Sequence, residues 1–254
     1  MGQSLAEGLG ALDDLRVVAL VDVVHPAELF GAVYAPSLSE LDATLVDVVV
    51  DFSSPSGVVT SASWCADHGV ALVVGATGLS ESERAALERA GEKVAVIAAA
   101  NFSVGAVLAE QFAATAAAFF DGVEIVELHH DAKADAPSGT SLATAAAIAR
   151  ARVARGAAPF VDSTQRRTLD GARGASADGG VRVHSVRLPG LLAHHEIILA
   201  SPGECLTIRH DSFDRRSFLQ GVALAVRYRG PTPCFLTSIA SLLAPSGGST
   251  GASR

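Results

Sequence analysis

The chain has 254 residues, of which 49% are apolar and 5% aromatic, and its 27 acidic and 19 basic side chains leave a formal charge of −8. A chain of this length buries a sizeable core as one large or two small domains. Its acidity and its lack of a basic run exclude nucleic acid and anionic membranes as expected partners. No apolar run reaches the ~18 residues that cross a bilayer, and the N-terminus lacks the features of a signal peptide. We therefore expect a soluble cytoplasmic protein.

Short runs rich in Val and Ala dominate the first hundred residues, at positions 16–22, 47–53, 71–77 and 94–100. Almost continuous apolar character is typical of parallel strands that are covered on both faces. Helical patterns separate the later runs, and the second of them opens with a capping box, Ser80-x-x-Glu83. Strands that alternate with helices predict βαβ units and an α/β, Rossmann-like doubly wound parallel sheet.

The pattern changes after residue 103. We expect a helix, a strand, an Ala-rich helix that ends at Gly156, an irregular Gly-rich stretch, and then hairpin-like strands at 181–188, 195–200 and 205–210. This order predicts a second domain of α+β type over residues 104–212. Residues 1–103, with 213–244 returning to them, would form the first domain, and the Gly- and Ser-rich tail 245–254 would be disordered.

A dinucleotide-binding fingerprint is expected near the N-terminus. Asp22 stands at the end of the first apolar run, where such folds place the carboxylate that binds the ribose hydroxyls. Counting back 20 residues reaches Gly2, which would be the last glycine of the G-x-G-x-x-G loop. The first strand and the other glycines would then lie upstream of Met1. The alternative is that Gly2 is merely the residue after the initiator methionine.

Two later loops fit the same nucleotide site. Gly75-Ala76-Thr77-Gly78 follows the third apolar run, and Ala99-Ala100-Asn101-Phe102-Ser103 follows the fourth. Both lie at carboxyl ends of predicted parallel strands, where open α/β sheets bind their ligands. Small side chains there would let a ribose and a nicotinamide ring approach the backbone. Each loop taken singly is also compatible with a plain turn.

The segment with the most chemical content runs from Glu124 to Thr140. A strand ends in His129-His130, Lys133 follows three residues later, and Ser138-Gly139-Thr140 opens a helix. Histidine and lysine at a strand end make a local positive cluster, and the first N–H groups of a helix bind anions. Ser138 or Thr140 could cap the helix and donate to a carboxylate. A lysine among cationic neighbours gives up its proton more readily, which suits proton donation near neutral pH.

This segment resembles the signature of the 4-hydroxy-tetrahydrodipicolinate reductases (dihydrodipicolinate reductases), E-x-H-H-x-x-K-x-D-x-P-S-G-T. The resemblance extends through Gly75-Ala76-Thr77-Gly78, through Ala99–Ser103 and through the late run Ile208-Arg209-His210-Asp211-Ser212. It implies a two-domain homotetramer whose second domain holds the substrate and packs its mixed sheet between subunits. The implied reaction is the NADH- or NADPH-dependent reduction of a cyclic imine dicarboxylate in lysine and diaminopimelate synthesis.

The resemblance also implies roles for individual residues. His129 would donate and accept protons, Lys133 would donate one, and His130, Ser138, Gly139 and Thr140 would bind the substrate. The residues implied for the cofactor lie at the predicted strand ends and at the N-terminus, and they are Gly2, Asp22, Gly75, Ala76, Thr77, Ala99, Ala100, Asn101 and Phe102. No metal is implied, and Cys65, Cys205 and Cys234 match no metal-ligand spacing, so we expect them to be small buried apolar residues.

Several departures from the family pattern keep other interpretations open. The opening strand and most of the glycine-rich loop are absent from the given sequence, Ala76 replaces a usual Thr, and no Arg follows Asp22, which leans towards NADH. One alternative is therefore a relative that keeps the substrate domain but cannot hold the cofactor. Another is a different two-domain dehydrogenase of the sugar or homoserine type, which would not need the His-His-x-x-Lys segment.

Overall fold

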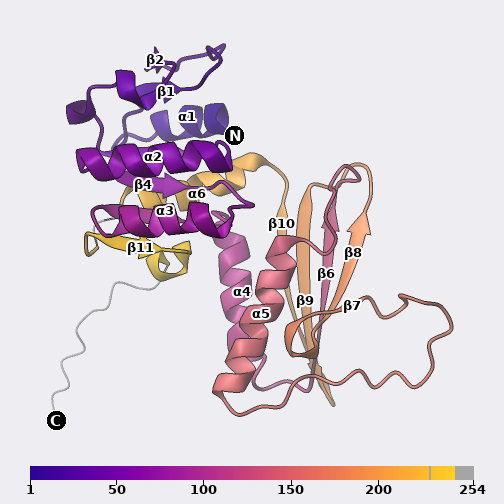
Figure 1. The fold of residues 1–254 in the computed structure, drawn as a ribbon. Helices are drawn as coiled ribbons and strands as arrows, with labels where there is room; N and C mark the ends of the chain where they lie inside the picture. Colours follow the sequence, from indigo (N-terminus) through magenta and orange to yellow (C-terminus); the bar gives the residue numbers. More distant parts are fainter. Residues whose placement is uncertain (229, 244–254) are drawn as a thin grey trace, which may run out of the picture. The chain divides into compact units, whose positions relative to one another are not determined.

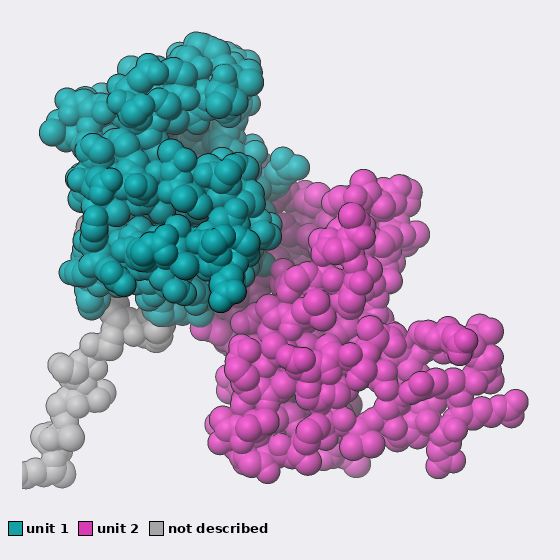
Figure 2. Space-filling model, in the orientation of Figure 1, with its two compact units in different colours: residues 1–104, 215–254 teal, residues 105–214 magenta. Residues whose placement is uncertain are grey.

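The computed structural model describes residues 1–228 and 230–243, and the chain divides into two compact units. Unit 1 contains Met1–Val104 and the chain from Arg215 onward, and unit 2 contains Gly105–Asp214 (Figure 2). The predicted tail 245–254 lies outside the described residues. None of the helices in the described ranges is long and apolar enough to cross a membrane.

The main sheet of unit 1 is parallel, with the order β11-β5-β4-β3 among the described strands. Its members are β3 (Val48–Asp51), β4 (Ala71–Val74), β5 (Ala95–Ala98) and β11 (Cys234–Leu236). The first three lie within predicted apolar runs, because a strand covered on both faces needs apolar side chains at successive positions. Their carboxyl ends meet at one edge of the sheet, since Asp51 pairs with Val74 and Val74 with Ala98.

Helices α2 (Pro55–His68) and α3 (Glu81–Gly91) pack on one face of this sheet (Figure 1). Ser54 caps α2, Pro55 occupies its first turn, and Gly69 ends it in the left-handed conformation that glycine adopts without strain. The predicted capping box at the start of α3 is confirmed, because Ser80 and Glu83 exchange side-chain and backbone hydrogen bonds. The buried side chains shared by these layers include Val58, Leu72, Leu87 and Val96.

The other face of the sheet receives α6 (Leu219–Val226), which contacts β4. A 3-10 turn, Arg215–Phe218, precedes α6 directly. Helix α1 (Gly2–Gly10) packs against α6 and buries Leu5 and Leu9. Helices on both faces confirm the doubly wound arrangement.

The first apolar run forms a shorter strand than predicted and does not pair with the main sheet among the described residues. Strand β1 (Ala19–Val21) pairs in parallel with β2 (Val33–Ala35) in a separate two-stranded sheet. Asp22 follows β1 directly, and its backbone N–H continues the pairing to the carbonyl of Ala35.

Unit 2 contains a mixed sheet of order β10-β9-β6-β8-β7, which confirms the mixed sheet expected from the sequence. Its strands are β6 (Gly122–His129), β7 (Ala175–Ser176), β8 (Arg182–Arg187), β9 (Ala193–Ser201) and β10 (Glu204–Ser212). Among the described strands of this sheet, only the β6–β8 pair is parallel, because the long connection through a helix returns the chain in the same direction.

Helices α4 (Val104–Ala116) and α5 (Gly139–Ala154) contribute to a core against one face of the mixed sheet. Small residues such as Ala113 and Ala145 are fully buried, and they let the helices approach Ile125 and Ile197 of the sheet closely. The short 3-10 turns of the described chain are Leu38–Glu40, Ala43–Leu45, Asp178–Gly180, Arg215–Phe218 and Ile239–Leu242.

Arg152, near the end of α5, fastens two neighbouring segments. Its Nη1 donates to the carbonyl oxygens of Ala117 at 2.6 Å and Phe120 at 2.9 Å, just beyond α4. Its Nε donates to the carbonyl of Ala158 at 2.8 Å, and its guanidinium lies 3.9 Å from the ring centroid of Phe160. One side chain thus satisfies carbonyl groups that the end of α4 leaves without helical partners.

Candidate active site

The proposed proton-transferring residues lie where β6 ends. His129 is the last residue of β6 and its side chain is 16% exposed, while Lys133, in the turn that follows, has a side chain 22% exposed. The turn is closed by a hydrogen bond from the Lys133 N–H to the carbonyl of His130, 3.2 Å long. Both side chains therefore reach solvent from a partly shielded position, as proton transfer to a bound substrate requires.

A buried carboxylate, Glu127, stands two residues before His129 and is missing from the predicted site. Its side chain is fully buried, and it accepts a hydrogen bond from Nδ1 of His129. Arg187 of β8 donates to both of its oxygens, from Nη1 at 2.9 Å and from Nη2 at 2.8 Å. Two parallel N–H···O bonds of this kind are the strongest and most directional ion-pair geometry in proteins.

Arg187 also reaches the segment that carries Lys133. Its Nη2 donates to the backbone carbonyl of Asp135 at 2.7 Å, and Lys133 Nζ donates to Oδ1 of Asp135 at 2.7 Å. The contact of Arg187 is not visible in the sequence, because β8 lies more than fifty residues after β6 in the chain. Parallel pairing of the two strands brings His129 opposite Arg187.

The ionisation of this cluster follows from burial and from its charges. Burial lowers the pKa of His129, and Lys133 and Arg187 act in the same direction against the opposing effect of Glu127, so the net shift is downward. Burial by itself raises the pKa of Glu127, but hydrogen bonds from Arg187, Ser185 and His129 outweigh it and hold that pKa below its usual value. The hydrogen bond from Lys133 likewise lowers the pKa of Asp135. The arrangement favours a neutral imidazole beside an ionised carboxylate.

The residues of the predicted anion site lie at the start of α5. Ser138 is the N-cap, is 3% exposed, and accepts from the Ser141 N–H at 3.2 Å. Its hydroxyl is also 2.9 Å from that of Ser141, so capping occupies it within the helix. Gly139 is exposed and has open space where a Cβ would stand, and Thr140 is half-buried. Gly139 and Thr140 are therefore the members of this group that a ligand can approach from outside.

Two further histidines lie on the same face of the sheet as Glu127. His195 of β9 pairs with Glu127, and His210 of β10 pairs with His195, so the three side chains form a row across the strands. Burial lowers the pKa of His195 to about 4, and no described residue makes a hydrogen bond to its Nε2. Burial lowers the pKa of His210 as well. Sequence reasoning missed both, since neither belongs to the His-His-x-x-Lys segment.

The predicted cofactor residues of unit 1 gather at the carboxyl edge of the main sheet. Gly75 follows β4 and Ala99 follows β5, and an added Cβ on Gly75 would lie 2.1 Å from the ring of Phe52, which follows β3. Asn101 accepts from the Ser103 N–H, which turns the loop back towards α4. The more exposed members of the group are Ala76, Thr77 and Ala100, whereas Ala99 and Phe102 are buried.

The two remaining predicted cofactor residues belong to other elements of unit 1. Asp22, exposed at the end of β1, accepts from the Val24 N–H at 3.1 Å. Gly2 is the first residue of α1, whose N-cap makes no side-chain hydrogen bond. Phe52 is the residue that sequence reasoning missed here, and its position directly after a buried strand was the available signal.

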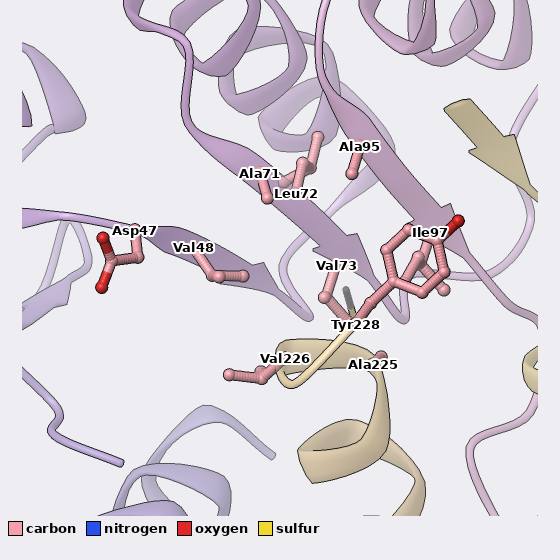
Figure 3. Close-up of a pocket in the computed structure, with 10 residues that line it drawn as sticks. All are labelled: Asp47, Val48, Ala71, Leu72, Val73, Ala95, Ile97, Ala225, Val226 and Tyr228. Carbon is pink, nitrogen blue, oxygen red and sulfur yellow. The ribbon is translucent and has the colours of Figure 1, made fainter. Parts of the chain in front are cut away.

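A cavity of about 270 Å³ lies on the α6 side of the main sheet (Figure 3). It is lined by apolar side chains of β3, β4 and β5 such as Val48, Val73 and Ile97, together with Tyr228. None of the predicted site residues lines it. The lining residues include the first residues of these strands, whereas the predicted cofactor loops follow their last residues, so this cavity is a packing feature of the described chain.

The cysteines show no site of their own. Burial raises the pKa of Cys65 to about 12, which keeps its thiol protonated and unreactive. The prediction that all three are buried is confirmed for Cys65 and wrong for the other two. Cys205, on the outermost strand β10 of the mixed sheet, is exposed, and Cys234 is half-buried. Within the described ranges, no group of three His, Cys, Asp or Glu side chains is placed to hold a metal ion.

Comparison with known proteins extends over nearly the whole chain. The family model described as dihydrodipicolinate reductase, N-terminus, matches residues 1–102, and that described as dihydrodipicolinate reductase, C-terminus, matches residues 105–243. The 4-hydroxy-tetrahydrodipicolinate reductases of Nocardia farcinica and Mycolicibacterium vanbaalenii are 45% and 44% identical to it, over 92% and 96% of this chain and 90% and 94% of their own. The chain belongs to the dihydrodipicolinate reductase family.

Solved structures agree with this membership. The dipicolinate-bound dihydrodipicolinate reductase of Paenisporosarcina sp. TG-14 is 34% identical, covers 95% of both chains and superposes with a TM-score of 0.84. A D-galactose-1-dehydrogenase of Rhizobium etli, 12% identical with a TM-score of 0.55, shares the fold alone. The resemblance inferred from the sequence is confirmed: the chain is an NAD(P)H-dependent oxidoreductase of lysine and diaminopimelate synthesis.

Proposed function

We propose that this chain reduces 4-hydroxy-tetrahydrodipicolinate to tetrahydrodipicolinate with NADH or NADPH. The observation that carries the proposal is the cluster at the end of β6, where His129 and Lys133 stand within the same short segment as the open start of α5. A dicarboxylate needs a positive site and N–H donors, and the proton that follows hydride transfer needs a positioned acid. The relatives named above carry this activity in their names.

The residues of unit 1 fit a nicotinamide coenzyme. A flat ring and a ribose need close access to backbone, and the carboxyl edge of β4 and β5 offers Gly75, Ala76 and Ala100 with no charged side chain among them. Asp22 is exposed and ionisable at the end of β1, which suits the ribose hydroxyls. The backbone N–H groups in the first turn of α1, near Gly2, can donate hydrogen bonds to the oxygens of a pyrophosphate.

The chemistry divides between the coenzyme and the chain. A bound nicotinamide would supply the hydride to the ring of the substrate, and the overall conversion to tetrahydrodipicolinate releases the 4-hydroxyl group as water. Gly139 and Thr140 hold a substrate carboxylate through backbone N–H groups and the threonine hydroxyl, and His130 adds a second polar contact. Lys133, held by Asp135 at 2.7 Å, donates the proton to the adjacent carbon, and His129 donates or accepts protons through the imidazole nitrogen that Glu127 does not occupy.

The proposal extends to organisation. Unit 1 binds the coenzyme, unit 2 binds the substrate, and four copies assemble through the mixed sheet of unit 2. In the described part of unit 2, α4 and α5 form a core with one face of this sheet, and Val126, Leu128 and Ile198 on the other face are only half-buried. This face also carries charged side chains such as Glu124, and its half-buried apolar side chains favour contact with another copy. We also propose a reducing, cytoplasmic location, which suits three free cysteines.

The direct test is a reductase assay of the purified chain. The substrate is unstable and is generated in place, and oxidation of NADH or NADPH is followed by its absorbance while mass spectrometry identifies the product. We expect consumption of the coenzyme that requires the substrate, with formation of tetrahydrodipicolinate. Coenzyme binding without turnover would contradict the proposed activity, and binding of neither coenzyme in calorimetry would favour a relative that has lost its cofactor site.

A further inference from the structure

Glu127 is out of place in the pattern of its strand. On the core face of β6, Val123 and Ile125 precede it and are buried against helix side chains, so a third apolar residue is expected at this position. Instead a carboxylate with no exposed surface stands there. Burying an ionised carboxylate is strongly unfavourable unless it is paired and hydrogen-bonded. A local rule broken in this way marks a position where a charge is needed for something other than packing.

The partners of Glu127 show what the charge holds. Its Oε2 accepts from Nδ1 of His129, so Nδ1 carries the proton of the neutral imidazole and Nε2 is left as the free nitrogen. The ring is therefore fixed both in tautomer and in rotation. Without this contact the imidazole ring would rotate and exchange tautomers. Its Nε2 would then be unprotonated and directed at the substrate for only part of the time.

Arg187 links Glu127 to the segment that carries Lys133. The guanidinium binds both oxygens of Glu127, and its Nη2 also donates to the carbonyl of Asp135 at 2.7 Å. Asp135 in turn accepts from Lys133 Nζ. A bonded path therefore runs from His129 through Glu127, Arg187 and Asp135 to Lys133, and it joins the end of β6 to the turn that follows.

We propose that Glu127 and Arg187 are positioning residues of the reductase, in which the carboxylate holds His129 with Nε2 free for the substrate and the guanidinium ties that carboxylate to the segment of Lys133. The inference rests on the proposed roles of His129 and Lys133. Neither Glu127 nor Arg187 touches the reacting atoms in this scheme. Their effect is on the geometry and the ionisation of the two groups that do.

The same strand offers a matched control. Glu124, on the opposite face of β6, also binds one arginine, Arg173, and one histidine, whose Nε2 lies 2.7 Å from its Oε2. The histidine is His184 of β8, and neither it nor Arg173 contacts the predicted site residues. Glu124→Gln thus removes the charge of a similar carboxylate–arginine–histidine group without touching the proposed path.

The ionisable groups that face His129 determine the expected pH effect. They are Glu127 on its own strand, Arg187 on β8, Lys133 on the following turn and His195 on β9. Of these, only Glu127 favours the protonated imidazole. Removing its charge leaves the opposing effects of burial and of the cations, so the limb of the kcat/KM profile that reports His129 moves towards lower pH.

The experiment compares the unaltered chain with Glu127→Gln, Arg187→Lys and Glu124→Gln, each checked for native folding and for the same oligomeric mass. We expect Glu127→Gln and Arg187→Lys to lower kcat by about 10-fold to 100-fold, because each loses a charge-assisted, orienting hydrogen bond. The KM for the coenzyme should stay within about twofold. Glu127→Gln should also shift the acid limb of kcat/KM, and Glu124→Gln should do neither.

The inference is overturned if Glu127→Gln keeps the kcat and the pH profile of the unaltered chain, or if Glu124→Gln changes both to the same extent. Should Glu127→Gln not fold, Arg187→Lys carries the test with the same two outcomes in kcat. Nitrogen NMR of the histidine ring, assigned with His129→Gln, gives a readout independent of turnover. A neutral His129 with its proton on Nδ1 supports the inference, and a proton on Nε2 contradicts it even if the chain is an active reductase.

Discussion

The carboxyl edge of the main sheet in unit 1 and the end of β6 in unit 2 differ in the kind of residue that forms them. At the first, Gly75, Ala76 and Ala100 contribute backbone and space and carry no charge. At the second, His129 and Lys133 belong to a network of ionisable side chains joined by hydrogen bonds. The first region should therefore be sensitive to added volume and the second to lost charge or lost hydrogen bonds. Each prediction below tests one side of this contrast.

The largest effect is expected from Lys133→Ala, which removes the proposed proton donor. A positioned general acid contributes roughly 10²–10⁴-fold, so kcat should fall by that factor while coenzyme binding is retained. Lys93 and Lys133 are the two lysines of the chain, and Lys93 is exposed on unit 1, which makes Lys93→Ala the matched control. Near-normal turnover of Lys133→Ala would show that another group delivers the proton.

The next effect concerns volume in unit 1. Gly75→Val places a Cβ 2.1 Å from the Phe52 ring, and overpacking of this kind costs about 1–3 kcal/mol of unfolding free energy. Denaturant unfolding and calorimetry with NADH should show lower stability and weaker coenzyme binding. Adding Phe52→Ala should restore part of the stability, since it removes the colliding ring. Gly10→Ala is the control, because its Cβ would meet only Val17 at 3.8 Å; if it were equally damaging, the steric explanation would fail.

A pH effect on stability is expected from His195. Its folded-state pKa of about 4 lies below the 6.5 of the unfolded chain, so the unfolded state binds more protons as the pH falls. Stability should be lost between about pH 6.5 and pH 4, and this one group should contribute ~2 kcal/mol of loss by about pH 5. Urea unfolding of His195→Leu should therefore depend less steeply on pH over that range. An equal slope in both proteins would show that His195 ionises freely in the folded state.

The smallest effect is expected at the start of α5. Thr140→Val keeps the shape of the side chain but removes its hydroxyl, and a hydrogen bond to a charged group is worth ~1.5 kcal/mol or somewhat more. The KM for the substrate should rise about tenfold with little change in kcat. Thr115→Val on α4, where the hydroxyl only returns to the Gln111 carbonyl, should have no such effect. An unchanged KM in Thr140→Val would move the carboxylate site elsewhere.

The fold was predictable wherever local signals agreed with burial. The apolar runs that became β3, β4 and β5 stand between helices with clear ends, such as the Ser80–Glu83 capping box and Gly69. Strands β2 and β11 were not predicted, because each has three residues and is defined by its partner rather than by its own pattern. The pairing of β1 with β2 is likewise a tertiary outcome that periodicity cannot show.

The sequence predicted only those members of the candidate site that lie close together along the chain. His129, Lys133, Gly139 and Thr140 belong to one segment, and their spacing indicated an anion site beside proton-transferring groups. Arg187 was out of reach because its contact with Glu127 depends on the parallel register of β6 and β8. Glu127 gave a signal after the fact, as a charge in the apolar half of an alternating strand, but alternation alone does not say which half is buried.

The contacts of Arg152 indicate where relatives of this chain can differ in length. Its guanidinium holds the chain beyond α4 and the start of the long segment that follows α5, next to Phe160 of the core of unit 2. The segment beyond Phe160, with exposed residues such as Val161 and Leu169, contributes little to the same core. Insertions and deletions would therefore be tolerated there, and relatives should vary in the length of this segment while they keep a guanidinium at its base.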